Sequence, residues 1–101
     1  MARNYACRFG EIDLIALDKG TLAFIEVRYR SRFQYGSASA SVTATKQQRV
    51  IMTAQTFLKS HRNYCNRHCR FDIIAFDGRG DSTKAQWLKA AFYSGEHPIY
   101  E

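Results

Sequence analysis

Two carboxylates stand in apolar, strand-like runs at positions where a β-hairpin would bring them together. Asp13 precedes the run LIAL of residues 14–17, and Glu26 lies within LAFIEV of residues 22–27. Turn residues, Asp-Lys-Gly at 18–20, separate the two runs, which is typical of a hairpin. If the turn consists of residues 19 and 20 alone, the ladder places Asp13 directly opposite Glu26.

The same register places Glu11 opposite Arg28, and because strand side chains alternate, all four charged side chains share one face. Two opposed carboxylates repel each other, so a cation between them is the best explanation of the pair. Oxygen ligands suit Mg²⁺ or Mn²⁺, and Arg28 would stabilise charge developing on a phosphate. The alternative is a solvated face with an ordinary ion pair between Glu11 and Arg28. Against this alternative, only one end of the face is polar, because it also holds three apolar residues, Ile15, Leu22 and Phe24.

This register depends on the length of the turn. A turn of three residues would shift the pairing by one position and separate the two carboxylates. The predicted metal ligands are therefore Asp13 and Glu26 only if the hairpin turns on two residues.

A helix is predicted over about residues 44–60, with Thr43 or the neighbouring Thr45 as its N-cap. Gln47 falls at the centre of the apolar stripe, so its amide is expected to point toward the sheet. There it would bind a substrate phosphate or a metal-bound water; the alternative is a buried glutamine satisfied by the backbone. Lys46 lies at the positive end of the helix dipole, where phosphate is favoured. The stripe consists of Val50, Ile51, Ala54, Phe57 and Leu58.

The remaining elements complete one α/β domain over residues 1–101. A third strand is predicted at residues 70–76, ended by a turn at 77–78, with a second turn at 81–84 and a short edge strand at 86–88. A loop is expected at residues 30–41 and a connection at 61–68. The order of strand, strand, helix, strand predicts a mixed sheet with a crossover helix on one face.

The charge balance indicates a polyanionic partner. The chain of 101 residues carries 15 Lys and Arg against 9 Asp and Glu, a net charge of +6. The segment RYRSRF of residues 28–33 alternates Arg28, Arg30 and Arg32 with aromatic residues. Phosphate contact combined with base stacking suits single-stranded or distorted nucleic acid. The alternatives are a basic protein without such a partner and a solvated basic loop.

Cysteine usage and hydropathy point to the cytoplasm. The three cysteines are an odd number, and the first residues lack the apolar stretch of a secretory signal, so reduced thiols are expected. No apolar run approaches the ~18 residues of a membrane span. The residues His61, Cys65, His68 and Cys69 match no familiar zinc spacing. Asp72 is expected to have a structural role, bonding locally at a strand entrance; the alternative is that it helps to order the site from a distance.

Four sequence blocks together resemble the bacterial YraN-type family of uncharacterised proteins. They are FGEIDLIA at 9–16, FIEVRYR at 24–30, SVT at 41–43 followed by KQ at 46–47, and CRFDIIA at 69–75. That family is similar to the PD-(D/E)XK nuclease superfamily, and particularly to archaeal Holliday-junction resolvases. The resemblance implies a restriction-endonuclease-like core and magnesium-dependent endonuclease activity on DNA, including branched or structured DNA. It also implies site roles: Asp13 and Glu26 match the two acidic ligands, Arg28 the motif lysine, and Gln47 the glutamine of resolvase-like members.

Three departures from that pattern affect the expectation. Ile12 replaces a proline that carries no chemistry, and Arg28 replaces the lysine. A guanidinium is effectively always protonated, so Arg28 can stabilise charge but cannot act as a general base. The family's N-terminal helix with a glutamate is expected to be absent here, which would expose apolar sheet surface and favour a homodimer.

The sequence therefore predicts a nucleic-acid-binding phosphodiester hydrolase. Its catalytic residues are Asp13, Glu26, Arg28 and Gln47, and Arg28, Arg30, Arg32 and Lys46 contact nucleic acid. The alternatives are a catalytically inactive nucleic-acid-binding module and a protein–protein scaffold whose basic face docks an acidic partner.

Overall fold

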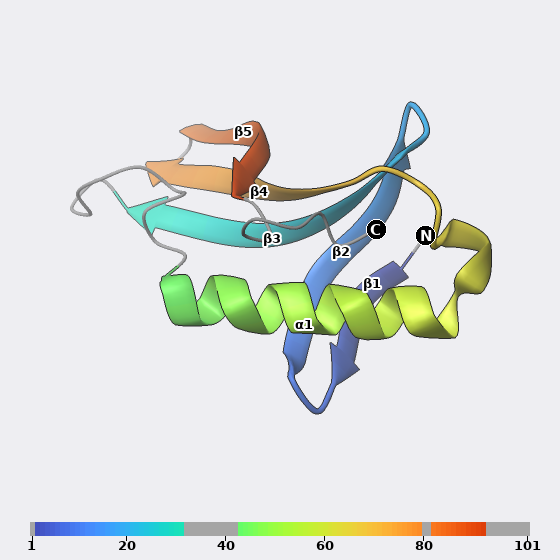
Figure 1. Cartoon of the computed structure of the whole chain (residues 1–101). Coiled ribbons are helices and arrows are strands. Elements are labelled where there is room, and N and C mark those ends of the chain that lie inside the picture. Colours follow the sequence, from blue (N-terminus) through green and yellow to red (C-terminus); the bar gives the residue numbers. More distant parts are fainter. Residues whose placement is uncertain (1, 32–42, 80–81, 93–101) are drawn as a thin grey trace.

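A computed structural model of the chain describes residues 2–31, 43–79 and 82–92. Its described part contains a five-stranded sheet in the order β1-β2-β3-β4-β5 and one long helix (Figure 1). β3 and β4 are parallel, and every other neighbouring pair is antiparallel. The elements are β1 Ala2–Cys7, β2 Gly10–Asp18, β3 Thr21–Ser31, α1 Ala44–Ser60, the 3-10 helix η2 Arg62–Tyr64, β4 Cys69–Arg79 and β5 Ser82–Phe92.

This is the predicted fold class, a mixed α/β sheet with a hairpin, a crossover helix and a further strand. α1 connects the parallel strands β3 and β4, as a parallel pair requires. The arrangement is consistent with a restriction-endonuclease-like core. Within the described ranges, no helix is long and apolar enough to cross a membrane.

The helix α1 has the bounds that its apolar spacing predicts, and Thr43 caps it by accepting the Lys46 N–H at 3.2 Å. Its apolar stripe packs on one face of the sheet. The Phe57 ring lies edge-on to Tyr5 of β1 at 5.2 Å and to Phe24 of β3 at 6.0 Å between centroids. α1 therefore joins the first and the central strands in one core.

The β2–β3 hairpin turns on two residues, Lys19 and Gly20, whose φ angles of 52° and 87° are both positive. Positive φ at both central positions defines the type I′ turn, which matches the twist of the strands. Pairs run from Asp18↔Thr21 to Leu14↔Ile25, so the predicted register is confirmed over this ladder.

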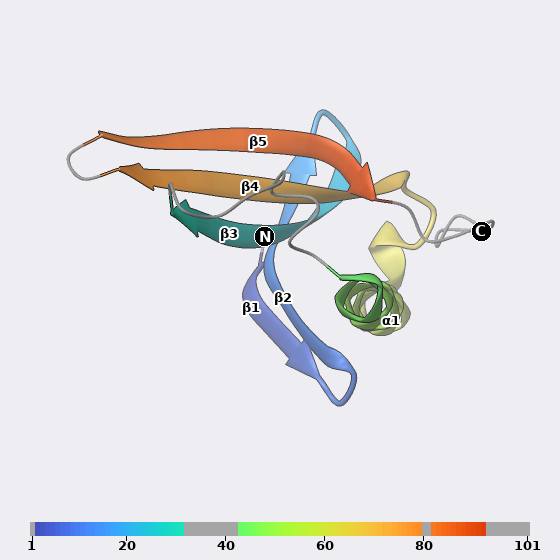
Figure 2. The ribbon, with the colours of Figure 1, turned by 90° about the vertical axis from the view of Figure 1, so that its left-hand side faces the viewer.

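β2 then leaves β3. Beyond Leu14 its residues pair only with β1, as in Tyr5↔Ile12. Ile12 and Ile15 are both buried in the core although they are three residues apart, so the regular alternation of the strand breaks between them. Figure 2 shows β1 and β2 bending away from β3, β4 and β5, and Figure 1 shows that both strands cross α1.

The bend makes two predicted pairs wrong. The β2–β3 ladder ends at Leu14↔Ile25, so Asp13 is not the ladder partner of Glu26. Glu11 does not face Arg28, because the β2–β3 ladder has already ended; Glu11 pairs with Ala6 of β1 and is exposed. The strand β1 was not predicted either. Its short alternation of polar and apolar residues becomes a strand because it pairs with the freed half of β2.

The turns predicted at residues 77–78 and 81–84 are also wrong where the structure describes these residues. Asp77 and Gly78 lie inside β4, and residues 82–84 lie inside β5, which is much longer than the predicted 86–88. β4 extends because β3 runs parallel to it as far as Ser31, and this ladder overrides the turn-forming composition. Of the loop predicted at 30–41, the first two residues belong to β3, and 32–42 lie outside the described residues.

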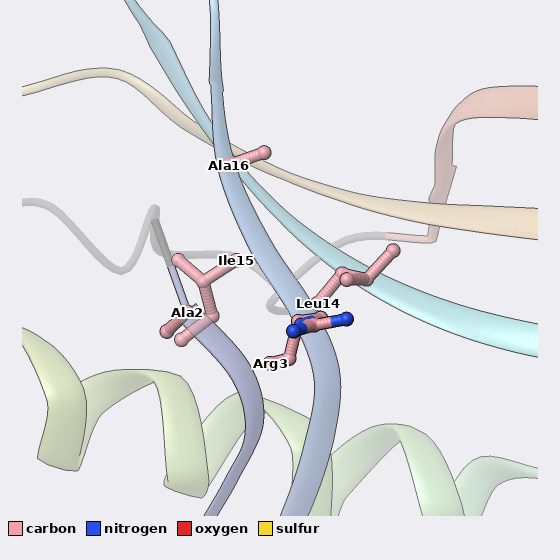
Figure 3. A pocket seen from close by; sticks show the side chains of 5 residues that line it. All are labelled: Ala2, Arg3, Leu14, Ile15 and Ala16. Carbon is pink, nitrogen blue, oxygen red and sulfur yellow. The ribbon is translucent and has the colours of Figure 1, made fainter.

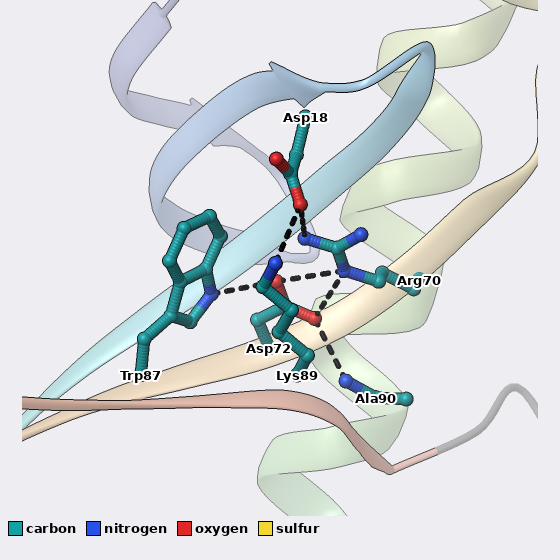
Figure 4. Close-up of polar contacts among 6 residues, drawn as sticks. All are labelled: Asp18, Arg70, Asp72, Trp87, Lys89 and Ala90. Carbon is teal, nitrogen blue, oxygen red and sulfur yellow. Dashed lines mark hydrogen bonds and ion pairs between the residues drawn. The ribbon is translucent and has the colours of Figure 1, made fainter.

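Asp72 lies on the face of the sheet away from α1 and joins β4 to β5 by hydrogen bonds (Figure 4). Its fully buried carboxylate accepts hydrogen bonds from Arg70 Nε at 3.0 Å, Trp87 Nε1 at 2.8 Å and the Ala90 N–H at 2.9 Å. The last bond spans the register shift between β4 and β5, where a ladder bond is missing. Asp72 thus has the expected structural role.

The turn offers a direct test of what fixes the register. Gly20→Val should lower the free energy of unfolding by about 1–2 kcal/mol, because a residue with a Cβ is strained at positive φ. A Cβ at Gly20 would meet nothing within 4 Å, so the effect isolates the backbone term. Lys19→Asn should instead stabilise slightly, since asparagine tolerates this region. Urea unfolding of the three proteins is the measurement, and an unchanged stability of Gly20→Val contradicts the turn.

Candidate functional site

Asp13 is fixed at the point where β2 separates from β3. Its Oδ2 accepts the backbone N–H of Val27 at 2.8 Å, just beyond the last pair of the ladder, Leu14↔Ile25. A side chain here takes the place of a strand partner. The carboxylate is therefore held against β3, beside the residue that precedes Val27.

That residue is Glu26, which is only 2% exposed on the face covered by α1. Burial, and then the negative charge of Asp13, raise the pKa of the Glu26 carboxyl, while the Lys46 and Arg28 cations act in the opposite direction. Glu26 Oε2 lies 3.4 Å from Lys46 Nζ. Glu26 Oε1 is buried and has no hydrogen-bond partner in the described part of the chain.

The first turn of α1 brings cationic and amide groups to this position. The Thr43 cap fixes the backbone of Lys46, whose ammonium reaches the buried carboxylate of Glu26. Gln47 is half-buried, and it lies one turn before Val50 and Ile51, which are in the core. The role of the Gln47 amide stays a prediction.

Arg28 follows Glu26 on the same face of β3. It is half-buried, and its charge acts to lower the pKa of Glu26. Its Nε is buried without a hydrogen-bond partner in the described residues. The side chain of Arg30 and the whole of Arg32, both predicted to contact nucleic acid, lie outside the described residues.

The fold thus brings the side chains of Asp13 and Lys46 close to Glu26, and the charge of Arg28 acts on the same carboxylate. Across the described ranges, no group of three or more His, Cys, Asp or Glu is placed to hold a metal ion. The charge of the half-buried Asp13 acts on the buried carboxylate of Glu26. Their assignment as ligands stays a prediction.

Comparison with known proteins places these residues in a family. The model of the Uncharacterised protein family UPF0102 matches residues 1–76, a segment that holds every predicted site residue. The chain belongs to this family. This confirms the predicted YraN-type family.

Similar UPF0102 proteins occur in several bacteria. The protein of Alcanivorax borkumensis is 50% identical over 95 residues, which cover 91% of this chain and 74% of the relative. Those of Aeromonas hydrophila and Pseudomonas fluorescens Pf-5 are 46% and 43% identical. They cover 91% and 93% of this chain and 68% and 77% of the relatives, respectively.

Asp72 and Cys69 of this UPF0102 chain are not assigned to the site. Asp72 lies on the opposite face of the sheet, within its own hydrogen bonds. Burial raises the pKa of the Cys69 thiol to about 11, which keeps it protonated. A hollow of about 360 Å³ is lined by Ala2, Arg3, Leu14, Ile15 and Ala16 and contains neither site carboxylate (Figure 3).

The contact between Lys46 and Glu26 was not predicted from the sequence. Sequence reasoning expected Lys46 to bind phosphate at the helix N-terminus, whereas its ammonium lies against a strand carboxylate. The available signal was the Thr43 cap, because it places residue 46 in the first turn, close to the sheet.

The burial of Glu26 predicts a stability change with a definite pH dependence. Because its pKa is raised above the ordinary 4.5, the folded chain holds this proton more tightly than the unfolded chain. Stability should therefore fall as pH rises from that ordinary value through the raised pKa. With chelator present, Glu26→Gln should be more stable than the parent by about 1 kcal/mol at neutral pH, and the gain should vanish in acid.

Urea unfolding across this pH range measures the effect. Glu11→Gln, on the exposed part of β2, is the matched control and should show no such gain. A Glu26→Gln protein that is less stable than its parent at neutral pH contradicts the electrostatic account.

Proposed function

We propose that this UPF0102 protein binds nucleic acid and hydrolyses phosphodiester bonds with a divalent cation, Mg²⁺ or Mn²⁺, held by Asp13 and Glu26. One observation carries the proposal: Glu26 is buried beside a second carboxylate and keeps an oxygen without a hydrogen-bond partner in the described residues. The resemblance to PD-(D/E)XK nucleases, which gives both residues ligand roles, supports it.

The residues fit a hard divalent cation. A buried acceptor without a donor and a repelling pair of carboxylates are both unfavourable, and a cation relieves both. Mg²⁺ commonly uses one or two carboxylates together with waters and substrate phosphates, so two protein ligands are sufficient. When bound, such an ion supplies Lewis-acid activation of the phosphodiester and of the attacking water.

The other side chains would handle the substrate. Arg28, permanently protonated and with a buried Nε that lacks a partner in the described residues, would stabilise negative charge on the phosphate. Lys46, 40% exposed at the helix N-terminus, would bind a neighbouring phosphate. Gln47 would orient a ligand from the same turn.

The net charge of +6 supports nucleic acid as the polyanion, and we propose cytoplasmic DNA, including branched or structured DNA, as the substrate. Arg28 at the lysine position favours a second candidate, a module that binds nucleic acid and does not cleave it. The protein–protein scaffold has less support, since a basic docking face explains neither the burial of Glu26 nor its nearness to Asp13.

Cleavage of a panel of linear duplex, single-stranded and branched DNA with Mn²⁺ tests the enzymatic proposal. We expect slow cleavage by the parent, because Arg28 cannot act as a base. Asp13→Asn and Glu26→Gln should each lower the initial rate by about 100-fold or more, through loss of a metal ligand. Glu11→Gln, two residues from Asp13 on the same strand, should cleave as the parent does. Binding without cleavage by the parent selects the module instead.

Phosphate contact by the site cations predicts a salt dependence of DNA binding. Log affinity should fall linearly with log salt, by about 0.7–0.9 per phosphate neutralised. Arg28→Gln and Lys46→Gln should each reduce this slope by about one contact. Lys59→Gln, at the exposed far end of α1, is the matched control and should leave the slope unchanged. Anisotropy titrations over a salt series measure it, and salt-independent binding rules out phosphate contact.

A further inference from the structure

The face of the sheet away from α1 carries exposed aromatic rings. Tyr29 of β3 is 76% exposed and Trp87 of β5 is 43% exposed. Tyr29 pairs with Phe76, and Ile74 pairs with both Val27 and Trp87, so these side chains form a contiguous patch. We call this set the aromatic platform: Val27, Tyr29, Ile74, Phe76 and Trp87.

The platform and the core lie on opposite faces. Along β4, Phe71, Ile73 and Ala75 are in the core beneath α1, and Ile74 and Phe76 alternate with them. Within the described residues, no helix covers this second face, as Figures 1 and 2 show.

The exposed rings are held in fixed orientations. Tyr29 and Phe76 are stacked, with centroids 5.2 Å apart and planes inclined by 19°. Trp87 is oriented by its hydrogen bond of 2.8 Å to the buried carboxylate of Asp72 (Figure 4). Rings that are already ordered lose little conformational freedom when a flat ligand stacks on them.

Cations border the platform at Trp87. Lys89 Nζ lies 4.5 Å and Arg70 Cζ 5.6 Å from the centre of its rings. Asp18 accepts hydrogen bonds from both cations, and Asp72 accepts one from Arg70. The whole chain carries +6, so a second copy would bring the same charge to this face, whereas a polyanion brings the opposite one.

We propose that the aromatic platform stacks the unpaired bases of single-stranded nucleic acid. Exposed, ordered rings match the π-faces of bases, and the cationic chain matches their phosphates. The inference rests on the proposed nucleic-acid binding and deepens it, since it makes DNA with an unpaired segment the preferred substrate. Tyr29 directly follows Arg28 in β3, so this strand carries a platform residue and a site residue on its two faces.

The only tryptophan of the chain is in the platform, so its fluorescence reports on this surface. Oligothymidylate should quench Trp87, whereas an abasic phosphodiester of the same length should not. Tyr29→Ala should weaken oligothymidylate binding about tenfold and leave binding of the abasic strand unchanged. Tyr29→Phe, which keeps the ring, should bind as the parent does.

Phe9→Ala is the matched control, because Phe9 is an aromatic residue beside a cation, Arg8, outside the platform. It should bind oligothymidylate as the parent does. Saturating binding that leaves Trp87 unquenched, or equal affinities of Tyr29→Ala and the parent, overturns the platform while the proposed function stands.

Two further outcomes also decide against the platform. A parent that binds no nucleic acid overturns the proposed binding function and the platform with it. Sedimentation that shows a dimer lost in Tyr29→Ala, with nucleic-acid affinity unchanged, makes this face a contact between copies of the chain.

Discussion

The hydrogen bond from the Val27 N–H to the Asp13 carboxylate is the contact on which the candidate site depends. β2 pairs with β3 near the turn and with β1 farther from it, where the strand crosses α1. A strand that changes partners leaves backbone donors unpaired, and a buried unpaired N–H is unfavourable. The carboxylate satisfies this donor with a charge-assisted bond. The same bond fixes a negative charge beside Glu26.

Comparison of the buried carboxylates Asp72 and Glu26 explains why one has a structural role and the other a functional one in this account. Asp72 accepts bonds from Arg70, Trp87 and the backbone of Ala90, and these donors satisfy it. Glu26 has one lysine contact at 3.4 Å, an oxygen that lacks a donor in the described residues, and a neighbouring negative charge.

A buried carboxylate that lacks donors and lies beside a negative charge, as Glu26 does, lowers the stability of the fold. Such groups are concentrated at functional sites. By contrast, Asp18 resembles Asp72. Hydrogen bonds from Lys89 and then Arg70 hold the pKa of the Asp18 carboxyl below its ordinary value, so this carboxylate also has donors. Among the described residues, Glu26 is thus a buried carboxylate with an oxygen that no donor satisfies.

Local signals in the sequence were enough to predict the hairpin register, the helix bounds and the fold class. The Lys19–Gly20 turn fixes the register, and the Thr43 cap and apolar stripe fix α1. What failed depends on distant pairing. The β2–β3 ladder ends at Leu14↔Ile25 because β2 then pairs with β1 alone. For this reason neither Asp13 with Glu26 nor Glu11 with Arg28 forms the predicted direct pair.

The length of β4 shows the same limit. Its extension through Asp77 and Gly78 depends on two flanking strands, β3 and β5, and composition alone favoured a turn there. Asp13 still lies beside Glu26, because it accepts the Val27 N–H just beyond the end of the ladder; the ligand role of both residues stays a prediction. Lys46 contacts Glu26 from the crossover helix α1; the Thr43 cap predicts its place in the first turn, but the strand residue that it contacts depends on how the helix packs on the sheet.

Titration of Mn²⁺ with the protein, followed by electron paramagnetic resonance of the free ion, tests the metal site most directly. The account predicts that the parent binds one ion per chain, that Asp13→Asn and Glu26→Gln lose it, and that Glu11→Gln keeps it. A parent that leaves the free-ion signal unchanged, or binding that survives in both site variants, contradicts the assignment of Asp13 and Glu26 as metal ligands.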